Sequence, residues 1–415
     1  MNFDRRTFLQ GLSALPFALP QIATLAGRPR RRARSLLLLW LDGGMSHLDT
    51  FDAKPEAPPE VRGDLGSVRS VVDGVFVSAH LPQLAKRLDR CALLRSITHG
   101  EGNHDRGAHL LLTGHRPSPV LVMPALGAVF GHDSGSALPA YVAIPESVDY
   151  AGSGFLPRPR SPFVTGGDPG RTDFAVRHLH DDARRARADA LRAQLDGLDA
   201  KHGTGGQRAR DRFVERARNL SADAEARTAF ELAAEPAERR ERYGRHRLGQ
   251  SSLLAARLLE RGVRTVLVTD KGWDHHDRIH TALTYGFPPK LVALDQALAA
   301  LLDDLRDRDG LQDVVVCVAS EFGRTPRLNP AGGRDHWPRA QSVLLFGAGI
   351  QPTVVGTTDA RGEEPRERPL SPEDLFATLV AALGLDPETT LRTADGRPVR
   401  LIAPGAVPVR EVLSS

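Results

Sequence analysis

Ser35-Leu36-Leu37-Leu38-Leu39-Trp40-Leu41 is an apolar run that ends on Asp42-Gly43-Gly44. Two later runs have the same form. Residues 263–269 lead into Gly272-Trp273-Asp274-His275-His276, and residues 313–319 lead into Ser320-Glu321-Phe322-Gly323. Such runs are typical of strands buried on both faces, as in parallel sheets. Because ligands gather outside the carboxyl ends of these strands, the polar clusters predict one shared site.

The remainder of the chain favours an α/β fold with a mainly parallel central sheet flanked by helices. Further strands are expected at 91–97 and 342–346, and leucines recur at helical spacing over 291–305. Ser371-Pro372-Glu373-Asp374 has the residues of a helix start. The segment 171–259 is rich in Arg, Ala, Asp and Glu and lacks a long apolar strand. It predicts a helical insert in a single domain spanning 35–415.

The first 34 residues differ from the rest. Arg5-Arg6 is followed by Thr7-Phe8-Leu9 and a moderately apolar stretch to Ala26, which indicates a twin-arginine (Tat) export signal with a basic junction after it. The alternative is a short helix that happens to carry two arginines. We expect export by the Tat machinery to the periplasm or the cell exterior. A permanent membrane span is not expected, because the stretch is shorter than the ~20 residues that a bilayer helix needs.

The basic character of the chain is confined to this leader. The net charge is +4, but seven arginines before Ser35 oppose only Asp4, so the folded body is slightly acidic. Nucleic acid is therefore not an expected partner. Cys91 and Cys317 both lie in apolar runs, which favours buried thiols over a disulfide.

The polar clusters carry carboxylates and imidazoles, which are the ligands that divalent metals take. Asp42 stands where the first run ends, and its two following glycines let backbone approach a ligand closely. Asp274 and His276 alternate along an extended segment, so both can reach one ion. The alternatives are a turn aspartate at Asp42 and surface histidines at 275–276.

Two further carboxylates belong to this pattern. Glu321 follows a strand with almost no polar residue, and a buried carboxylate needs a cation or a proton. It is therefore either a metal ligand or the partner of Arg324 or Arg327. His336 can close the metal shell from a loop, with Asp335 orienting it.

Several linked motifs resemble the DUF1501 family of exported bacterial proteins, within the alkaline phosphatase and sulfatase superfamily. They are 43–55, 272–276, 320–326, 333–337 and 371–375. The resemblance spans almost the whole chain after the leader. It implies an alkaline phosphatase-like fold and the hydrolysis or transfer of phosphate or sulfate esters, commonly with two metals and a hydroxyl or formylglycine nucleophile.

The resemblance also assigns metal-binding positions: Asp42 as the first-strand aspartate, Asp274 and His276 as a mid-sheet pair, Glu321 in place of an aspartate, and His336 as the last histidine. The metal would be zinc, calcium, magnesium or manganese. Phe322 departs from the pattern, since it stands where the superfamily has a metal-binding histidine. This substitution weakens one metal site.

The nucleophile departs as well. Asp105 to Gly114 is similar to the helix that follows the sulfatase nucleophile, and this register places His104 where Ser, Thr or Cys would stand. Neither cysteine is followed by the proline and arginine that formylglycine formation requires. Thr98, Ser46 or a water molecule on the metal could attack instead, with His104 as ligand or acid/base.

Two functions remain open from the sequence. One is an exported metal-dependent hydrolase of phosphate or sulfate esters. The other is a non-catalytic periplasmic or surface protein of the same fold, which recognises an anionic glycan or an envelope partner. Fold alone does not decide between them.

Overall fold

The computed structural model describes residues 32–131, 137–176, 223–281 and 286–414. Eight strands form the central sheet in the order β12-β4-β11-β8-β1-β7-β5-β6. Their bounds are β1 Ser35–Asp42, β4 Ala92–Ile97, β5 Tyr141–Ile144, β6 Phe163–Val164, β7 Thr265–Lys271, β8 Val314–Ala319, β11 Gln341–Gly347 and β12 Thr353–Val355. All neighbours pair in parallel except β11, which is antiparallel to β4 and β8.

Strand β1 lies near the centre of the sheet and contributes side chains to two hydrophobic cores. Leu37, Leu39 and Leu41 enter one core, and Leu36 and Trp40 enter the other. Successive side chains of a strand point to opposite faces, so a strand covered on both sides must be apolar throughout. The predicted fold class, a mainly parallel sheet flanked by helices, is confirmed.

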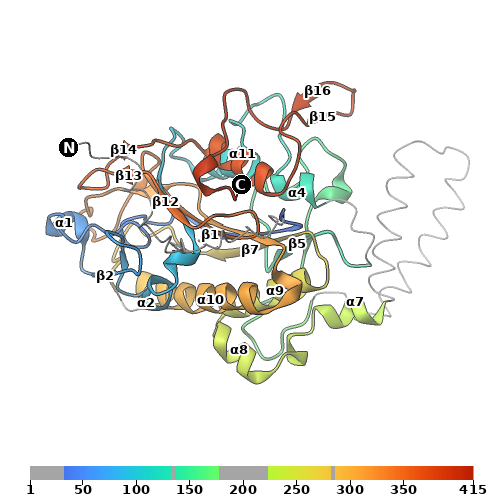
Figure 1. The fold of residues 1–415 in the computed structure, drawn as a ribbon, viewed down its shortest axis with the longest axis horizontal. Helices are drawn as coiled ribbons and strands as arrows, with labels where there is room; N and C mark the ends of the chain where they lie inside the picture. The colour runs from blue at the N-terminus through green and yellow to red at the C-terminus, as the bar shows by residue number, and fades with distance from the viewer. Residues whose placement is uncertain (1–31, 132–136, 177–222, 282–285, 415) are drawn as a thin grey trace, which may run out of the picture. The chain divides into compact units, whose positions relative to one another are not determined.

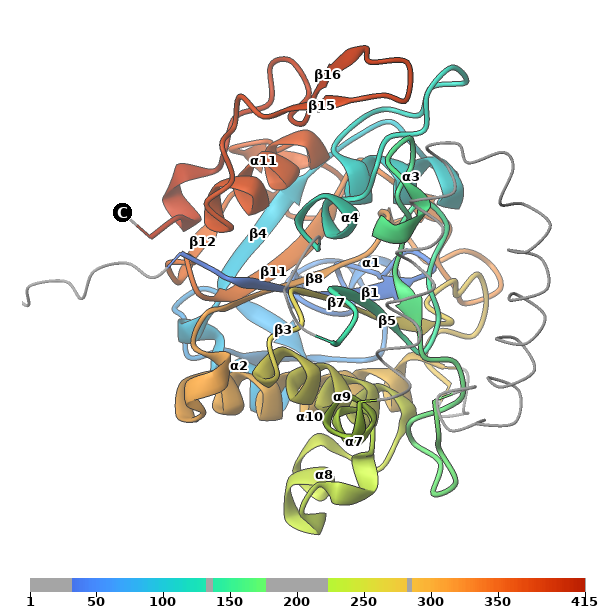
Figure 2. The same ribbon diagram turned by 90° about the vertical axis from the view of Figure 1, so that its right-hand side faces the viewer.

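Helices cover both faces of this sheet (Figures 1 and 2). One layer contains α2 (Pro82–Ala85), α9 (Arg247–Glu260) and α10 (Phe287–Asp307), and the other contains α3 (His104–Thr113), α4 (Leu126–Phe130) and α11 (Pro372–Ala382). Helix α10 includes the predicted leucine stripe. Helix α11 begins with the predicted serine cap, where Ser371 and Asp374 form a reciprocal capping box.

Smaller elements complete the described chain. They are α1 (Pro59–Arg62), α7 (Ala224–Ala229), α8 (Ala237–Tyr243), and the strand pairs β2 (Ser67–Arg69) with β3 (Phe76–Ser78), β9 (Gly323–Arg324) with β10 (His336–Trp337), β13 (Thr357–Thr358) with β14 (Pro365–Glu367) and β15 (Thr390–Arg392) with β16 (Pro398–Arg400). No described helix is long and apolar enough to cross a membrane. Cys91 and Cys317 are free and buried.

Two predictions from the sequence concern segments that lie wholly or partly outside the described residues. The twin-arginine leader and most of its basic junction lie at 1–31, outside the described residues. Of the expected insert at 171–259, residues 177–222 also lie outside, and α7, α8 and most of α9 occupy the described remainder. The domain boundaries therefore stay a prediction.

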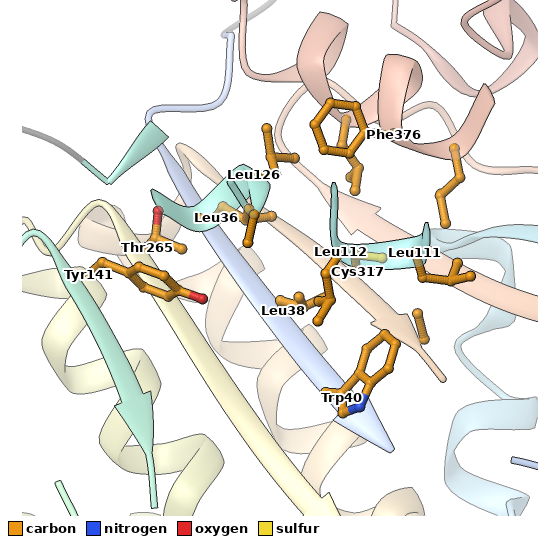
Figure 3. A pocket seen from close by; sticks show the side chains of 15 residues that line it. Leu36, Leu38, Trp40, Leu111, Leu112, Leu126, Tyr141, Thr265, Cys317 and Phe376 are labelled. Atoms are coloured by element: carbon orange, nitrogen blue, oxygen red, sulfur yellow. The ribbon is translucent and has the colours of Figure 1, made fainter. Parts of the chain in front are cut away.

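A small enclosed cavity of about 20 Å³ lies between the sheet and the layer of α3, α4 and α11 (Figure 3). Its lining is mostly apolar, with Leu36, Trp40, Leu112 and Phe376 among the side chains, and Thr265 adds a hydroxyl that has no hydrogen-bond partner among the described residues. The hydroxyl of Tyr141 donates to the carbonyl of Ala151 at 3.0 Å and so needs no water partner. The cavity is large enough for about one water molecule. It is a packing feature, separate from the polar clusters.

Candidate metal centre

The segments after β1, β7 and β8 meet at one edge of the sheet because glycine permits close backbone contact. Gly43 has φ +122°, and a Cβ there would lie 2.5 Å from the backbone nitrogen of Asp274. Gly44 has φ +78°, and its Cβ would lie 2.5 Å from the Phe322 ring. Both positions require glycine for conformation and for space. The Asp-Gly-Gly cluster thus brings the three strand ends together.

A short ladder brings in the fourth cluster. In the β9–β10 pair, His336 stands opposite Arg324. The backbone nitrogen of Arg334 donates to the carbonyl of His275 at 3.0 Å, which ties this loop to the segment after β7. Residues 274–276 and 334–336 therefore lie side by side although they are far apart in sequence.

His104, Asp274 and His336 present one ligand atom each, all within 4.8 Å of one another. Asp274 is central: its Oδ2 lies 3.4 Å from His104 Nε2, and its Oδ1 lies 3.3 Å from His336 Nε2. His276 adds a fourth group, with Nε2 2.9 Å from the same Oδ1 and 3.1 Å from His336 Nε2. Their side chains are 27–45% exposed, although the Nε2 atom of His104 itself is buried.

Each of the three imidazoles is held through its other nitrogen. Nδ1 of His104 donates to Glu321 at 2.5 Å, Nδ1 of His276 donates to Asp335 at 2.8 Å, and Nδ1 of His336 donates to the carbonyl of Gly102 at 2.8 Å. Carbonyl and carboxylate oxygens only accept, which places the proton of each neutral ring on Nδ1. Every Nε2 then directs a lone pair towards Asp274.

Acceptor atoms therefore face acceptor atoms across this cluster. The Nε2 atoms of His276 and His336 lie 3.1 Å apart and both face an oxygen of Asp274. With neutral rings this arrangement is repulsive, and either a bound cation or a second proton on the imidazoles relieves it. Histidines that bind a metal through one ring nitrogen usually donate the N–H of the other to a carboxylate or a carbonyl, as these three do. The donor set thus fits a metal ion.

The charge state of Asp274 supports the same conclusion. Burial alone would raise its pKa, but the hydrogen bond and charge of Arg324, with His104 and His276, lower the pKa to about 2. The group is therefore an anion at neutral pH. The hydrogen bond to Glu321 raises the pKa of His104 against the effect of burial, and burial lowers the pKa of His336.

Glu321 lies behind the cluster rather than in it. Its side chain is 1% exposed and accepts from the Gly43 nitrogen and the Ser320 hydroxyl, both at 3.0 Å, as well as from His104. The structure thus places this predicted ligand as the group that orients His104. Of the two arginines considered as its partner, Arg324 binds Asp274 and Arg327 lies near Glu60.

Asp42 also lies outside the three-residue ligand group. It ends β1 and accepts from the indole nitrogen of Trp40 at 3.1 Å. Burial, followed by the charge of Glu321, raises its pKa. Phe322 is fully buried, and its ring packs against His104 and His336 at 5.0 and 4.7 Å. Phe322, which stands where the superfamily pattern has a histidine, therefore forms an apolar side of the cluster.

Of the three predicted catalytic residues, His104 joins the cluster. Ser46 is fully buried, and its hydroxyl donates to Asp49 at 2.5 Å. Thr98 is partly buried after β4, where its backbone nitrogen donates to Leu370. One expected pairing needs correction: Asp335 orients His276, and the carbonyl of Gly102 orients His336, because the loop before α3 lies against β10.

Two residues contribute in ways that the sequence did not indicate. Arg324, expected as a possible partner of Glu321, is 1% exposed and binds Asp274 instead. Gly107 of α3 faces Glu321, where a Cβ would lie 3.1 Å from its carbonyl oxygen. This glycine lets the start of α3 approach β8 closely enough for His104 to reach Glu321.

A family model described as "Protein of unknown function (DUF1501)" matches residues 33–413. Solved structures with similarity include the PsFucS1 sulfatase from Pseudoalteromonas sp., at 13% identity over 86% of this chain and 69% of that one, with TM-score 0.41. A protein of the alkaline phosphatase superfamily from Vibrio parahaemolyticus shows 13% identity over 86% and 68%, with TM-score 0.34. The C-terminal periplasmic domain of EcEptC from Escherichia coli shows 10% identity over 91% and 87%, with TM-score 0.38. No curated protein matches the sequence.

Proposed function

We propose that this chain, which belongs to the DUF1501 family, is a metal-dependent hydrolase of phosphate or sulfate esters. The observation that carries the proposal is the convergence of Nε2 atoms from three histidines on the ionised carboxylate of Asp274. A metal ion placed among these atoms would be bound by all of them. The cluster is also partly exposed, so an ester from solution can approach it.

His104, Asp274 and His336 would hold the ion, with His276 as a further donor. A set rich in imidazole favours zinc over magnesium, calcium and manganese. Such an ion would polarise the ester oxygen and activate a water molecule. Of the two predicted hydroxyl nucleophiles, Ser46 is buried, so Thr98 or a water molecule would be the attacking group.

The protein's own side chains fix this geometry before a substrate arrives. Glu321 and Asp335 hold the protons on Nδ1 of His104 and His276, so that both Nε2 atoms stay available. Arg324 holds the carboxylate of Asp274 through a short hydrogen bond. Groups fixed in this way contribute to rate because they do not reorganise during the reaction.

The second candidate is a binding protein with the same site and no turnover. The buried hydroxyl of Ser46 and the phenyl ring of Phe322 in a ligand position favour it. It would use the same metal to recognise an anionic glycan or an envelope partner. Metal binding is common to both candidates, so turnover is the property that separates them.

The test begins with the metal content of the purified full chain and its activity on aryl phosphate, phosphodiester and sulfate esters. Asp274→Asn is expected to lower metal affinity by about 100-fold or more and to abolish turnover, since even outer-shell partners are worth ~10–100-fold. Asp277→Asn is the control, because that exposed carboxylate lies near Arg278. Metal binding without turnover would favour the binding protein, and absence of both would refute the proposal.

We also propose that the protein works outside the cytoplasm, on the evidence of Arg5-Arg6 and the stretch that follows. Replacing both arginines by lysine in a bacterial host should retain the full-length precursor in the cytoplasm. Unchanged appearance of the processed protein in the periplasmic fraction would contradict this proposal.

A further inference from the structure

We propose that the centre holds one metal ion, and that the buried guanidinium of Arg324 is a built-in second cation beside it. The inference rests on the proposed function, because it concerns the number of ions that the same site takes. Two observations support the inference: the hydrogen bonds of Arg324, and the hydrogen bonds that the nearby carboxylates already accept.

The guanidinium of Arg324 is surrounded by oxygen atoms. Its Nε donates to the carbonyl of Gly44 at 2.7 Å, its Nη1 donates to the carbonyl of Arg334 at 3.0 Å, and its Nη2 donates to the carbonyl of Gly43 and to Asp274. Main-chain carbonyls with a carboxylate are the ligands that hard divalent cations take. Here N–H groups occupy all four oxygens. The side chain is 1% exposed, so solvent does not compete for them.

The last N–H direction of Arg324 points at the imidazole cluster, with Nη1 3.4 Å from Nε2 of His276. Its donors are thus turned inwards, towards the protein, and none is left to clamp a substrate anion. Arg324 is therefore a positioning residue that fixes Asp274 and the turn at Gly43 and Gly44. Its charge stays at the site in every state of the reaction.

The other carboxylates near the centre, those of Glu321, Asp42 and Asp335, each accept a hydrogen bond from a protein donor. Glu321 accepts from Gly43 and His104 on Oε1 and from Ser320 on Oε2, and Asp42 accepts from the indole of Trp40. Phe322 offers only its ring at this edge. Among the residues that the structure describes, the one group of three or more ligand side chains close enough for an ion is His104, Asp274 and His336.

Like charges at a separation of a few ångströms repel strongly where solvent screening is weak. A second divalent ion that shared Asp274 would lie against the guanidinium bound to the same oxygen, Oδ1. The guanidinium keeps its charge at any accessible pH. The first ion can use Oδ2 beside His104, the carboxylate oxygen that Arg324 does not contact, while the Nε2 atoms of His276 and His336 approach from the side of Oδ1.

The experiment counts ions on the purified full chain. The protein is stripped with a chelator, incubated with excess Mn²⁺ or Zn²⁺ and separated from free metal, and the bound metal is measured per chain. Electron paramagnetic resonance of the Mn²⁺ form gives a second readout that does not depend on activity. We expect one equivalent and the spectrum of isolated Mn²⁺ ions.

Two variants test the part played by Arg324. Arg324→Gln removes the charge and keeps an amide donor, and we expect it to admit a second equivalent. Arg324→Lys keeps the charge and is the matched control, which should stay at one. A folded Arg324→Gln protein that stops at one equivalent would refute the role of the guanidinium. If that variant does not fold, as judged by circular dichroism, the wild-type count decides.

The outcomes separate this inference from the proposed function. Two equivalents in the wild type, with an exchange-coupled Mn²⁺ spectrum, would overturn the single-ion proposal and leave a metal-dependent hydrolase standing. No bound metal would overturn both. One equivalent that is lost in Asp274→Asn supports the single-ion centre whether or not an ester is turned over.

Discussion

Glu321 shows how one buried carboxylate sets the state of a neighbouring side chain. Its side chain is 1% exposed, and its two oxygens accept hydrogen bonds from three donors. A fully satisfied carboxylate is costly to move, so His104 is held at a fixed angle with its Nε2 outward. The residue acts on the candidate centre through His104.

His99, after β4, is a residue whose titration should be visible in stability. Burial lowers its pKa from 6.5 to about 4 in the folded chain. The unfolded chain then binds a proton between these values and the folded chain does not. Its stabilising contribution is complete above pH 6.5, falls as the pH drops, and is lost below about pH 4. The loss amounts to about 3 kcal/mol.

Urea unfolding between pH 7 and pH 4, with a chelator present, measures this effect. The free energy of unfolding should decline with acidification in the wild type and decline less steeply in His99→Gln. Equal slopes in the two proteins would show that the imidazole of His99 is not responsible.

At the residue level, the sequence indicated the candidate ligand side chains better than it indicated their hydrogen-bond partners. Asp274 and His276 were recognisable because they follow a buried run, and His336 because it stands beside Asp335 on a loop ahead of the next strand. The partners of their second nitrogens were not, since Gly102 contributes a backbone oxygen that no sequence pattern marks. Glu321 was ambiguous for the same reason: a buried carboxylate needs a partner, and only the fold shows that the partner is His104.

At the level of elements, α10 is fixed to α8 by one buried carboxylate. Asp304 of α10 is 1% exposed and accepts from Arg239 at 2.7 Å and from the hydroxyl of Tyr243 at 2.9 Å. Arg242 donates to it as well. Removing one partner of a buried ion pair leaves the others uncompensated, which costs about 3–5 kcal/mol.

Asp304→Ala should therefore lower the free energy of unfolding by about that amount, as measured in urea, with metal stoichiometry per folded chain unchanged. Asp307→Ala, three residues further along the same helix, removes an exposed carboxylate that pairs only with its neighbour Arg306 among the described residues. It should behave as the wild type. Similar losses in both variants would contradict the buried network.

The strands differed in how clearly the sequence predicted them. Strands β1, β7 and β8 are covered on both faces, and this burial produced the continuous apolar runs that predicted them. The four-residue strand β5 and the two-residue strand β6 are too short to leave such a signal. The antiparallel direction of β11 was also hidden, because it depends on how a loop returns and not on composition.

For the whole molecule, a bound ion would connect parts of the chain that are distant in sequence. His104 begins α3, Asp274 follows β7 and His336 belongs to β10. A ligand that binds only the folded chain stabilises it, by about 2.7 kcal/mol at 100 times its dissociation constant. Zinc added to the chelator-treated protein should raise the midpoint of thermal unfolding by a few degrees.

Excess chelator should reverse this rise, and Asp274→Asn should not show it. Scanning calorimetry on the full chain provides the measurement. An equal rise in the variant would mean that the ion binds elsewhere on the protein.

The strand order has a consequence for the protein's biosynthesis. Strand β4 has β11 on one side and β12 on the other, and both leave the ribosome only after most of the polypeptide has been made. Until then both edges of β4 lack their partners, and unpaired edges readily join other chains. The nascent protein should therefore depend on chaperones late into translation.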